Sequence, residues 1–258
     1  MTGSAGPRSR DRDELDAVLY DWHNDHLLRR QRADEAFYAE LLADRRTTLV
    51  LGAGTGRVAA PVAHRSSGVV LAVDRSRQRL RRATARAGVL ATVADLRQLP
   101  FVDRFADAAV CPYSTFQLLA TEDDRRAALA GAARALVDGG VLYLDVSTSF
   151  ENRPAGRRTR VVLEAECPAL SAVVTEVEEA ERAGDHLRLV RSFYRAGQPL
   201  AEYAERWTFA AALRLEELLP AAGFHISRTV CGYRPGVAGH RRIYVAVRTA
   251  ERSGHHRR

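Results

Sequence analysis

Three glycines that follow a short apolar run constrain the fold of this chain more than any other feature. The run 47–51 predicts a buried strand, residues 52–56 (GAGTG) a tight turn, and residues 58–64 a helix. Glycines in such a turn accept positive φ and let a ligand approach the backbone, while the N–H groups that open the helix favour a polar or anionic group. A dinucleotide fingerprint would place its third glycine at Arg57, so the spacing argues against a nicotinamide or flavin enzyme. Asp74, about 20 residues on, stands where nucleotide-binding units hold the ribose hydroxyls.

Strand-like runs alternate with helical stretches through the first half of the chain. This pattern predicts βαβ units, a parallel sheet and a ligand beyond the carboxyl ends of the strands. The expected strands are 48–51, 69–73, 89–93, 108–111 and 141–146, and the expected helices are 58–64, 77–87 and 123–136. The ligand-facing rim is then formed by residues 52–56, Asp74, Asp95, Leu96 and 112–117.

The regions around this alternation have other patterns. We expect residues 1–12 to be a disordered tail and residues 13–46 to form a helical lid, with a break between two helices near Asn24 and Asp25. Four runs with period-two character between residues 149 and 210 predict an inserted antiparallel sheet, which either caps the substrate or forms a dimer face.

The aromatic residues Tyr203, Trp207 and Phe209 fall on one face of the last of these runs, where they either pack on the main domain or serve as a cap or dimer face. The core, formed by residues 47–148 and 211–250, closes with a helix at 213–222 and a hairpin of 225–233 and 242–248, and residues 251–258 form a tail.

Composition narrows the function classes. The net charge is +7 with 39 basic residues, all of them arginine, which raises the possibility of a nucleic-acid partner. We interpret the densest basic run, residues 75–86, as a solvated helix face, because no aromatic residues are interleaved to stack bases. The three cysteines lie far apart and predict neither a disulfide framework nor a metal site. The chain shows no apolar run that would span a membrane and no secretory signal at its start, so we expect a cytoplasmic protein.

Five motifs in order resemble the class I S-adenosylmethionine-dependent methyltransferases. They are VLGAGTGR, LAVD ending at Asp74, VADLRQLPF, FADAAVCPYSTFQLL and ARALVDGGVLYLDV, which together cover residues 47–148, and the likeness resumes at 213–249. The resemblance implies a Rossmann-like α/β fold: a seven-stranded, mostly parallel sheet with its last strand antiparallel and helices on both faces. It also implies S-adenosyl-L-methionine as cofactor and S-adenosylhomocysteine as product.

The same resemblance assigns the cofactor-binding residues. Gly52, Ala53, Gly54 and Gly56 would pass the methionine part closely, and Asp74 with the adjacent Arg75 would hold the ribose. Asp95 would accept a hydrogen bond from the adenine amine and Leu96 would donate its backbone N–H to the ring, while Cys111 and Pro112 would flank the sulfonium. For Asp74 and Asp95 a strand-end cap is the alternative role.

Candidate residues for the acceptor side are fewer. YSTFQLL and the long insertion resemble small-molecule enzymes that methylate amino sugars or other natural-product groups, and Tyr20-Asp21 matches a YD found near the N-terminus of many of them. Gln117 departs from the histidine that is frequent at its position in amino-sugar N-methyltransferases, which leaves the acceptor atom, nitrogen or oxygen, open. Tyr20, Tyr113, Gln117 and His23 are the candidates for orienting the acceptor or removing its proton.

Two other functions stay open. CPYS lacks the acid or amide and the second proline of nucleic-acid N-methyltransferases, so this pattern argues against a nucleic-acid (RNA) substrate although the charge would suit it. A non-catalytic S-adenosylmethionine-binding protein is the third possibility, because a fold does not establish activity. We expect a small-molecule substrate and a possible homodimer through the inserted strands.

Overall fold

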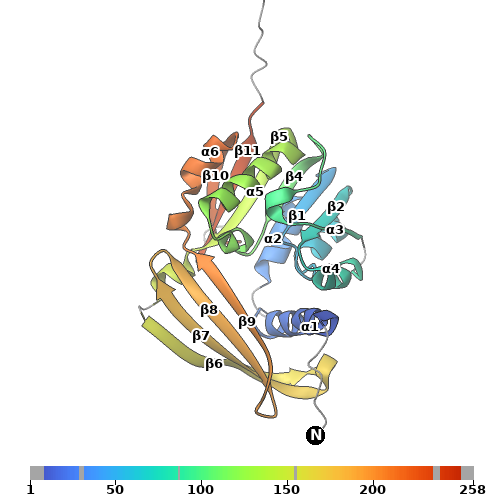
Figure 1. Ribbon diagram of the computed structural model, residues 1–258. Helices are drawn as coiled ribbons and strands as arrows, with labels where there is room; N and C mark the ends of the chain where they lie inside the picture. The colour runs from blue at the N-terminus through green and yellow to red at the C-terminus, as the bar shows by residue number, and fades with distance from the viewer. Residues whose placement is uncertain (1–8, 29–31, 87, 154–155, 235–238, 251–258) are drawn as a thin grey trace, which may run out of the picture.

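The central feature of the fold is a seven-stranded sheet with the strand order β10-β11-β5-β4-β1-β2-β3 (Figure 1). The computed structural model describes residues 9–28, 32–86, 88–153, 156–234 and 239–250. The strands of this sheet are β1 (Thr47–Leu51), β2 (Val69–Asp74), β3 (Val89–Val93), β4 (Ala106–Cys111), β5 (Leu136–Ser147), β10 (Phe224–Cys231) and β11 (Arg241–Arg248). β11 pairs antiparallel with both β5 and β10, and the pairs among β1 to β5 are parallel. The Rossmann-like fold predicted from the sequence is therefore confirmed.

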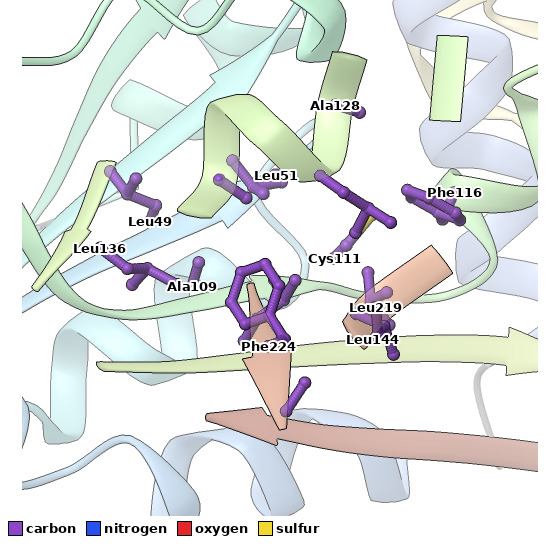
Figure 2. Close-up of a cluster of buried hydrophobic side chains, with 14 of the residues drawn as sticks. Leu49, Leu51, Ala109, Cys111, Phe116, Ala128, Leu136, Leu144, Leu219 and Phe224 are labelled. Carbon is purple, nitrogen blue, oxygen red and sulfur yellow. The ribbon is translucent and has the colours of Figure 1, made fainter. Parts of the chain in front are cut away.

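Helices cover both faces of this sheet because successive side chains of its strands point to opposite sides. On one face α2 (Ala33–Leu41), α3 (Ala59–Arg65) and α4 (Arg77–Thr84) bury Tyr38, Val62 and Leu80 against strand residues such as Val50. On the other face α5 (Glu122–Ala135) and α6 (Leu215–Ala221) pack on the alternate positions of the same strands. Figure 2 shows this second cluster, in which Ala128 and Leu219 come from the two helices and Leu49, Leu51 and Leu144 from the sheet.

A second, four-stranded antiparallel sheet follows β5. It has the order β6-β7-β8-β9, with β6 (Gly156–Cys167), β7 (Ala172–Ala183), β8 (His186–Arg195) and β9 (Gln198–Thr208). The predicted inserted sheet is confirmed, with β8 as expected and the other three strands longer than the period-two runs indicated. In Figure 1 it extends away from the core, and the N-terminal helix α1 (Ser9–Leu27) lies between it and α4.

The N-terminal segment differs from the sequence prediction in two places. α1 begins at Ser9, inside the expected disordered tail 1–12, while residues 1–8 and the C-terminal tail 251–258 lie outside the described residues. The expected two helices are present as α1 and α2, but the break between them lies after Asn24 and Asp25, because α1 continues to Leu27. The Asn24 side chain donates to the Tyr20 carbonyl at 2.8 Å, one turn back, which keeps this residue compatible with a helix.

The aromatic residues of β9 and its end divide between two apolar clusters. Tyr203 packs edge-on against Phe193, in the cluster that α1 covers with Leu19 and Trp22. Trp207 stacks at a tilt on Phe150, in a cluster that also contains Phe209. This face of the inserted sheet is therefore covered by α1 at one end and by segments adjoining the core at the other.

No helix within the described ranges is both long and apolar enough to cross a membrane.

Candidate active site

The glycine turn lies where β1 ends, between the end of β2 and α4. Gly52, Gly54 and Gly56 all have positive φ, at 72°, 56° and 87°. The Gly52 and Ala53 N–H groups both donate to the Val73 carbonyl, at 2.7 and 2.9 Å. A side chain at Gly52 would lie 2.1 Å from Thr115 Cγ2, so these positions need glycine for space as well as for conformation. The turn is thus a fixed backbone surface at the carboxyl edge of the sheet.

The Asp74 carboxylate fixes the backbone of this turn at Gly54. Its Oδ2 accepts the Gly54 N–H at 2.8 Å, and its Oδ1 accepts the Ser76 N–H at 2.9 Å. An ionised carboxylate has about four lone-pair sites, so both oxygens keep the capacity to accept another donor. A carboxylate beside a glycine-rich turn suits the diol of a nucleoside ribose, which is the role that the sequence predicts for Asp74. Arg75, the next residue, is exposed.

Asp95 has the capping role that the sequence left as its alternative. It caps the 3₁₀ turn Leu96–Gln98 by accepting the Arg97 N–H at 2.9 Å, and its carboxylate binds the Arg97 guanidinium at 2.9 and 2.7 Å. These hydrogen bonds lower the pKa of Asp95, so the group is an anion at neutral pH. A contact from Asp95 to an adenine amine therefore has to share the carboxylate with Arg97. Leu96 is half-buried in the same turn.

The loop after β4 brings a strained tyrosine to the same edge. Cys111 and Pro112 are buried, while Tyr113 and Ser114 have φ values of 52° and 69°. Such left-handed conformations are unfavourable for side-chain-bearing residues unless neighbouring contacts compensate. Here two guanidinium groups contact the Tyr113 ring, that of Arg57 at 4.7 Å and that of Arg241 at 4.9 Å from its centroid.

A buried carboxylate that sequence reasoning missed supports this loop. Asp145, on β5, is fully buried and accepts hydrogen bonds from the Tyr38 and Tyr233 hydroxyls at 3.1 and 2.6 Å. It also accepts from the Tyr113 N–H at 3.1 Å and from Arg241 Nε at 2.8 Å. One side chain therefore joins α2, the β10-β11 hairpin and the loop after β4. The signal in the sequence was an aspartate inside the otherwise apolar run 141–146.

Tyr20 of α1 lies over the glycine turn. Its hydroxyl oxygen is 3.1 Å from the position that a Cβ at Gly54 would occupy, and Arg79 stacks on its ring at 4.2 Å from the centroid. Burial raises the pKa of Tyr20 against the opposing effect of Arg79 and Arg57, so the phenol is neutral and can donate a hydrogen bond. The YD match thus has a structural basis, since Asp21 also helps to hold α1 in place.

Opposite charges dock α1 on α4. Arg79 binds both oxygens of Asp16, at 2.8 and 2.9 Å, while Arg82 binds Asp21 at 3.1 Å and Glu14 at 3.0 Å. The interpretation of residues 75–86 as a solvated helix face is therefore wrong in part, because Arg79 and Arg82 face the acidic side of α1. The sequence alone did not show which helix this basic run would meet.

The Arg79–Asp16 pair gives a testable prediction for the lid. Replacing Arg79 by alanine removes a two-pronged ion pair and the stacking on Tyr20, so α1 should open more often. We expect amide hydrogen exchange in α1 to become about tenfold faster, as a loss of about 1.4 kcal/mol implies. Arg77→Ala, at an exposed position of the same helix, is the control and should leave the exchange of α1 unchanged. Equal exchange in both variants would mean that α1 is held in place by its apolar contacts alone.

Gln117 is engaged entirely with the backbone. It is fully buried, its amide nitrogen donates to the Ser147 and Thr208 carbonyls at 3.1 and 2.9 Å, and its oxygen accepts the Ser147 N–H at 2.7 Å. It thereby links the ends of β5 and β9, where the inserted sheet leaves and rejoins the core. These hydrogen bonds occupy both ends of the Gln117 amide.

His23 lies one turn after Tyr20 on α1 and faces the inserted sheet. Its Nδ1 is 2.7 Å from Oε2 of Glu176, a fully buried carboxylate on β7. A carboxylate at Nδ1 favours the tautomer with the proton on that nitrogen, which leaves Nε2 as an acceptor. Of the four acceptor-side candidates, Tyr20 and His23 lie on the lid helix α1 and Tyr113 lies in the loop after β4. The fourth, Gln117, is hydrogen-bonded to the backbone where the inserted sheet joins the core.

Comparisons with known proteins agree with this geometry. The sequence profile of the family described as Methyltransferase domain matches residues 49–140. A cypemycin N-terminal methyltransferase from a Streptomyces species is 30% identical over 187 residues, which are 71% of this chain and 74% of that protein.

Two solved structures share the fold. An S-adenosylmethionine-dependent methyltransferase from Clostridium acetobutylicum is similar over 90% of this chain and 98% of its own, with a TM-score of 0.75 at 17% identity. A sugar N-methyltransferase from a Streptoalloteichus species is similar over 97% of this chain and 96% of its own, with a TM-score of 0.68 at 21% identity.

Proposed function

Because this chain belongs to the class I S-adenosylmethionine-dependent methyltransferases, we propose that it transfers the methyl group of that cofactor to an amine nitrogen of a small natural-product molecule. The observation that carries this proposal is the pair Tyr20 and His23 on one face of α1. Tyr20 packs on the glycine turn, and His23, a turn away, has one nitrogen bound to a buried carboxylate. A proton acceptor thus lies on the same helix face as the residue that covers the cofactor turn.

The cofactor is S-adenosyl-L-methionine, and its product is S-adenosylhomocysteine. The residues at the turn fit it: the backbone at Gly54 is free of a Cβ, and Asp74 retains acceptor capacity for the ribose. The residues that we propose to contact it are Gly52, Ala53, Gly54, Gly56, Asp74, Arg75, Asp95, Leu96, Cys111 and Pro112. When bound, it supplies a methyl group on a sulfonium, which reacts in line with a nucleophile that has a free electron pair.

The chain's own groups then have separate tasks. Burial raises the pKa of both Tyr20 and Tyr113, so these phenols orient the acceptor as hydrogen-bond donors and do not act as bases. Burial likewise raises the pKa of Cys111, which keeps its thiol protonated and unreactive. His23 accepts the proton of the acceptor at Nε2. Gln117 has a positioning role, since it fixes the junction of the core and the inserted sheet.

Nitrogen is favoured over oxygen by two considerations. The cypemycin methyltransferase acts at an N-terminus, and the Streptoalloteichus relative is a sugar N-methyltransferase. In addition, an amine has a free electron pair once its ammonium form has lost one proton, whereas a neutral alcohol has to lose its proton as it reacts. An RNA substrate is less well supported, because Arg79 and Arg82 of the basic run already bind acidic residues of α1.

We also propose a cytoplasmic location and a homodimer through the inserted sheet, the latter tested by gel filtration.

A labelled-methyl assay tests the proposed function. The wild-type chain with methyl-labelled S-adenosylmethionine is offered glucosamine, trialanine amide, their N-acetylated forms, a phenol and a short RNA. We expect label on the two free amines. Label on the phenol or the RNA alone would reject the amine, and cofactor binding without transfer to any acceptor would favour a non-catalytic binding protein.

A further inference from the structure

The face of the inserted sheet that meets α1 is apolar at its two ends and charged in the middle. At one end Val174 and Phe193 pack under α1, and at the other Leu187 and Leu189 pack with Phe209. The strand register places four charged residues between these clusters on the same face, namely Glu176 and Glu178 of β7, Arg191 of β8 and Glu205 of β9. A charged band that interrupts two apolar clusters is costly unless its groups are paired or bind something.

Glu176 is the least satisfied member of this band. Its side chain is 0% exposed, and its Oε2 is hydrogen-bonded to Nδ1 of His23. Within the described part of the chain, its Oε1 has no hydrogen-bond partner, and neither has the buried Nε of Arg191, 3.7 Å away. A carboxylate in a protein interior without its full set of partners carries a large desolvation cost. Glu178, two residues along the same face, differs because Arg153 and Arg160 both donate to it, at 2.7 and 3.1 Å.

Glu176 and Glu205, the carboxylates near His23, share a single guanidinium group, that of Arg191. Glu176 and Glu205 contribute two negative charges, and Arg191, which lies 3.7 Å from the first and 3.6 Å from the second, contributes one positive charge. These three side chains alone carry a net charge of −1, while Glu178 on the same face has its own cations in Arg153 and Arg160. Both Arg191 contacts are ion pairs longer than a hydrogen bond, and Glu205 also accepts a hydrogen bond from Trp207 Nε1 at 3.2 Å.

This group adjoins the cofactor turn. Tyr20, whose hydroxyl lies next to Gly54, is one helical turn from His23 on α1. Burial raises the pKa of Tyr20, and Asp74 and Glu205 raise it further. Glu205 of the inserted sheet and Asp74 of the core therefore both act on the phenol of Tyr20.

We propose that Glu176, Glu205 and His23 form the subsite for the acceptor, and that this subsite binds a protonated primary or secondary amine. The proposal rests on the proposed function and specifies its substrate as a cation. The two carboxylates attract the ammonium group. One N–H bond then breaks with its electron pair left on the amine nitrogen, and the proton goes to Nε2 of His23, whose Nδ1–H is held by Glu176.

The test uses Glu176→Gln and Glu205→Gln, which keep the side-chain shape and remove the charge, with Glu178→Gln as the matched control on the same face. Glucosamine and trialanine amide are the probes, each paired with its N-acetylated form. In the wild type the free amines should bind the S-adenosylhomocysteine-loaded protein and the acetylated forms should not. In E176Q and E205Q we expect the KM for the free amines to rise about 30-fold, the loss typical of a charged hydrogen bond, with E178Q near wild type.

Two further measurements separate this proposal from the proposed function. Calorimetry should give the same affinity for S-adenosylhomocysteine in all four proteins, and nitrogen-15 NMR of the wild type should show His23 with its proton on Nδ1. The proposed subsite would be overturned by an unchanged KM in both E176Q and E205Q, by equal binding of free and acetylated probes, or by a proton on Nε2 of His23. Methyl transfer to some other acceptor in that case would leave the methyltransferase function standing.

Discussion

Replacing Asp74 by alanine is expected to weaken S-adenosylmethionine binding about 100-fold, or about 2.7 kcal/mol. Two effects add: the ribose hydroxyls lose a charged acceptor, and the Gly54 and Ser76 N–H groups lose the oxygens that fix the turn. Isothermal calorimetry with the cofactor measures the change directly. Asp74→Asn should be impaired as well, because an amide nitrogen facing the Gly54 N–H places two donors together.

The control for Asp74 is Asp103→Ala. Asp103 is a well-exposed carboxylate that meets Arg134 at 3.4 Å, so removing it changes the net charge equally and touches no part of the turn. The cofactor affinity of the Asp103→Ala variant should stay within about twofold of wild type. If Asp74→Ala binds the cofactor as tightly as Asp103→Ala does, the ribose is held elsewhere and the assignment of the turn fails.

Replacing Asp145 by alanine should produce the largest loss of stability. The side chain is fully buried and satisfies Tyr38, Tyr233, Arg241 and the Tyr113 N–H at once. Its removal leaves a buried guanidinium without its partner, which typically costs about 3–5 kcal/mol. Urea unfolding followed by circular dichroism measures this change.

Asp138→Ala is the matched control for Asp145, because Asp138 lies on the same strand but is 39% exposed, with Arg104 at 3.3 Å and Arg248 at 3.7 Å. We expect that control to lose less than about 1 kcal/mol. A loss of similar size in both variants would show that the hydrogen bonds around Asp145 add nothing beyond a surface ion pair.

Much of the fold could be predicted from local sequence signals. The alternation of apolar strands and helices gave β1 to β5 in order, and the period-two runs gave all four strands of the inserted sheet, because both patterns follow directly from which side chains must be buried. The error at Asn24 arose from treating a polar pair as a break, although the Asn24 side chain bonds to the turn before it. Local propensity does not reveal that bond.

The site was less predictable, because its contacts join segments far apart in the sequence. Gly54 and Asp74 could be paired from their spacing in a known type of unit, and the structure joins them by a hydrogen bond. The pairing of His23 with Glu176 spans 153 positions and depends on how α1 meets the inserted sheet. Neither residue has a neighbour in the sequence that would indicate its partner.

Hydrogen exchange of the wild-type protein with and without S-adenosylhomocysteine tests the central claim most directly. If the cofactor lies in the cradle of the glycine turn under α1, protection should rise at residues 52–57, 74–76, 95–98 and 111–115 and in the segment of α1 that contains Tyr20. The parts of the inserted sheet away from Glu205 and the strands β10 and β11 should keep their exchange rates. Protection confined to those other regions, or no protection at saturating ligand, would contradict the account.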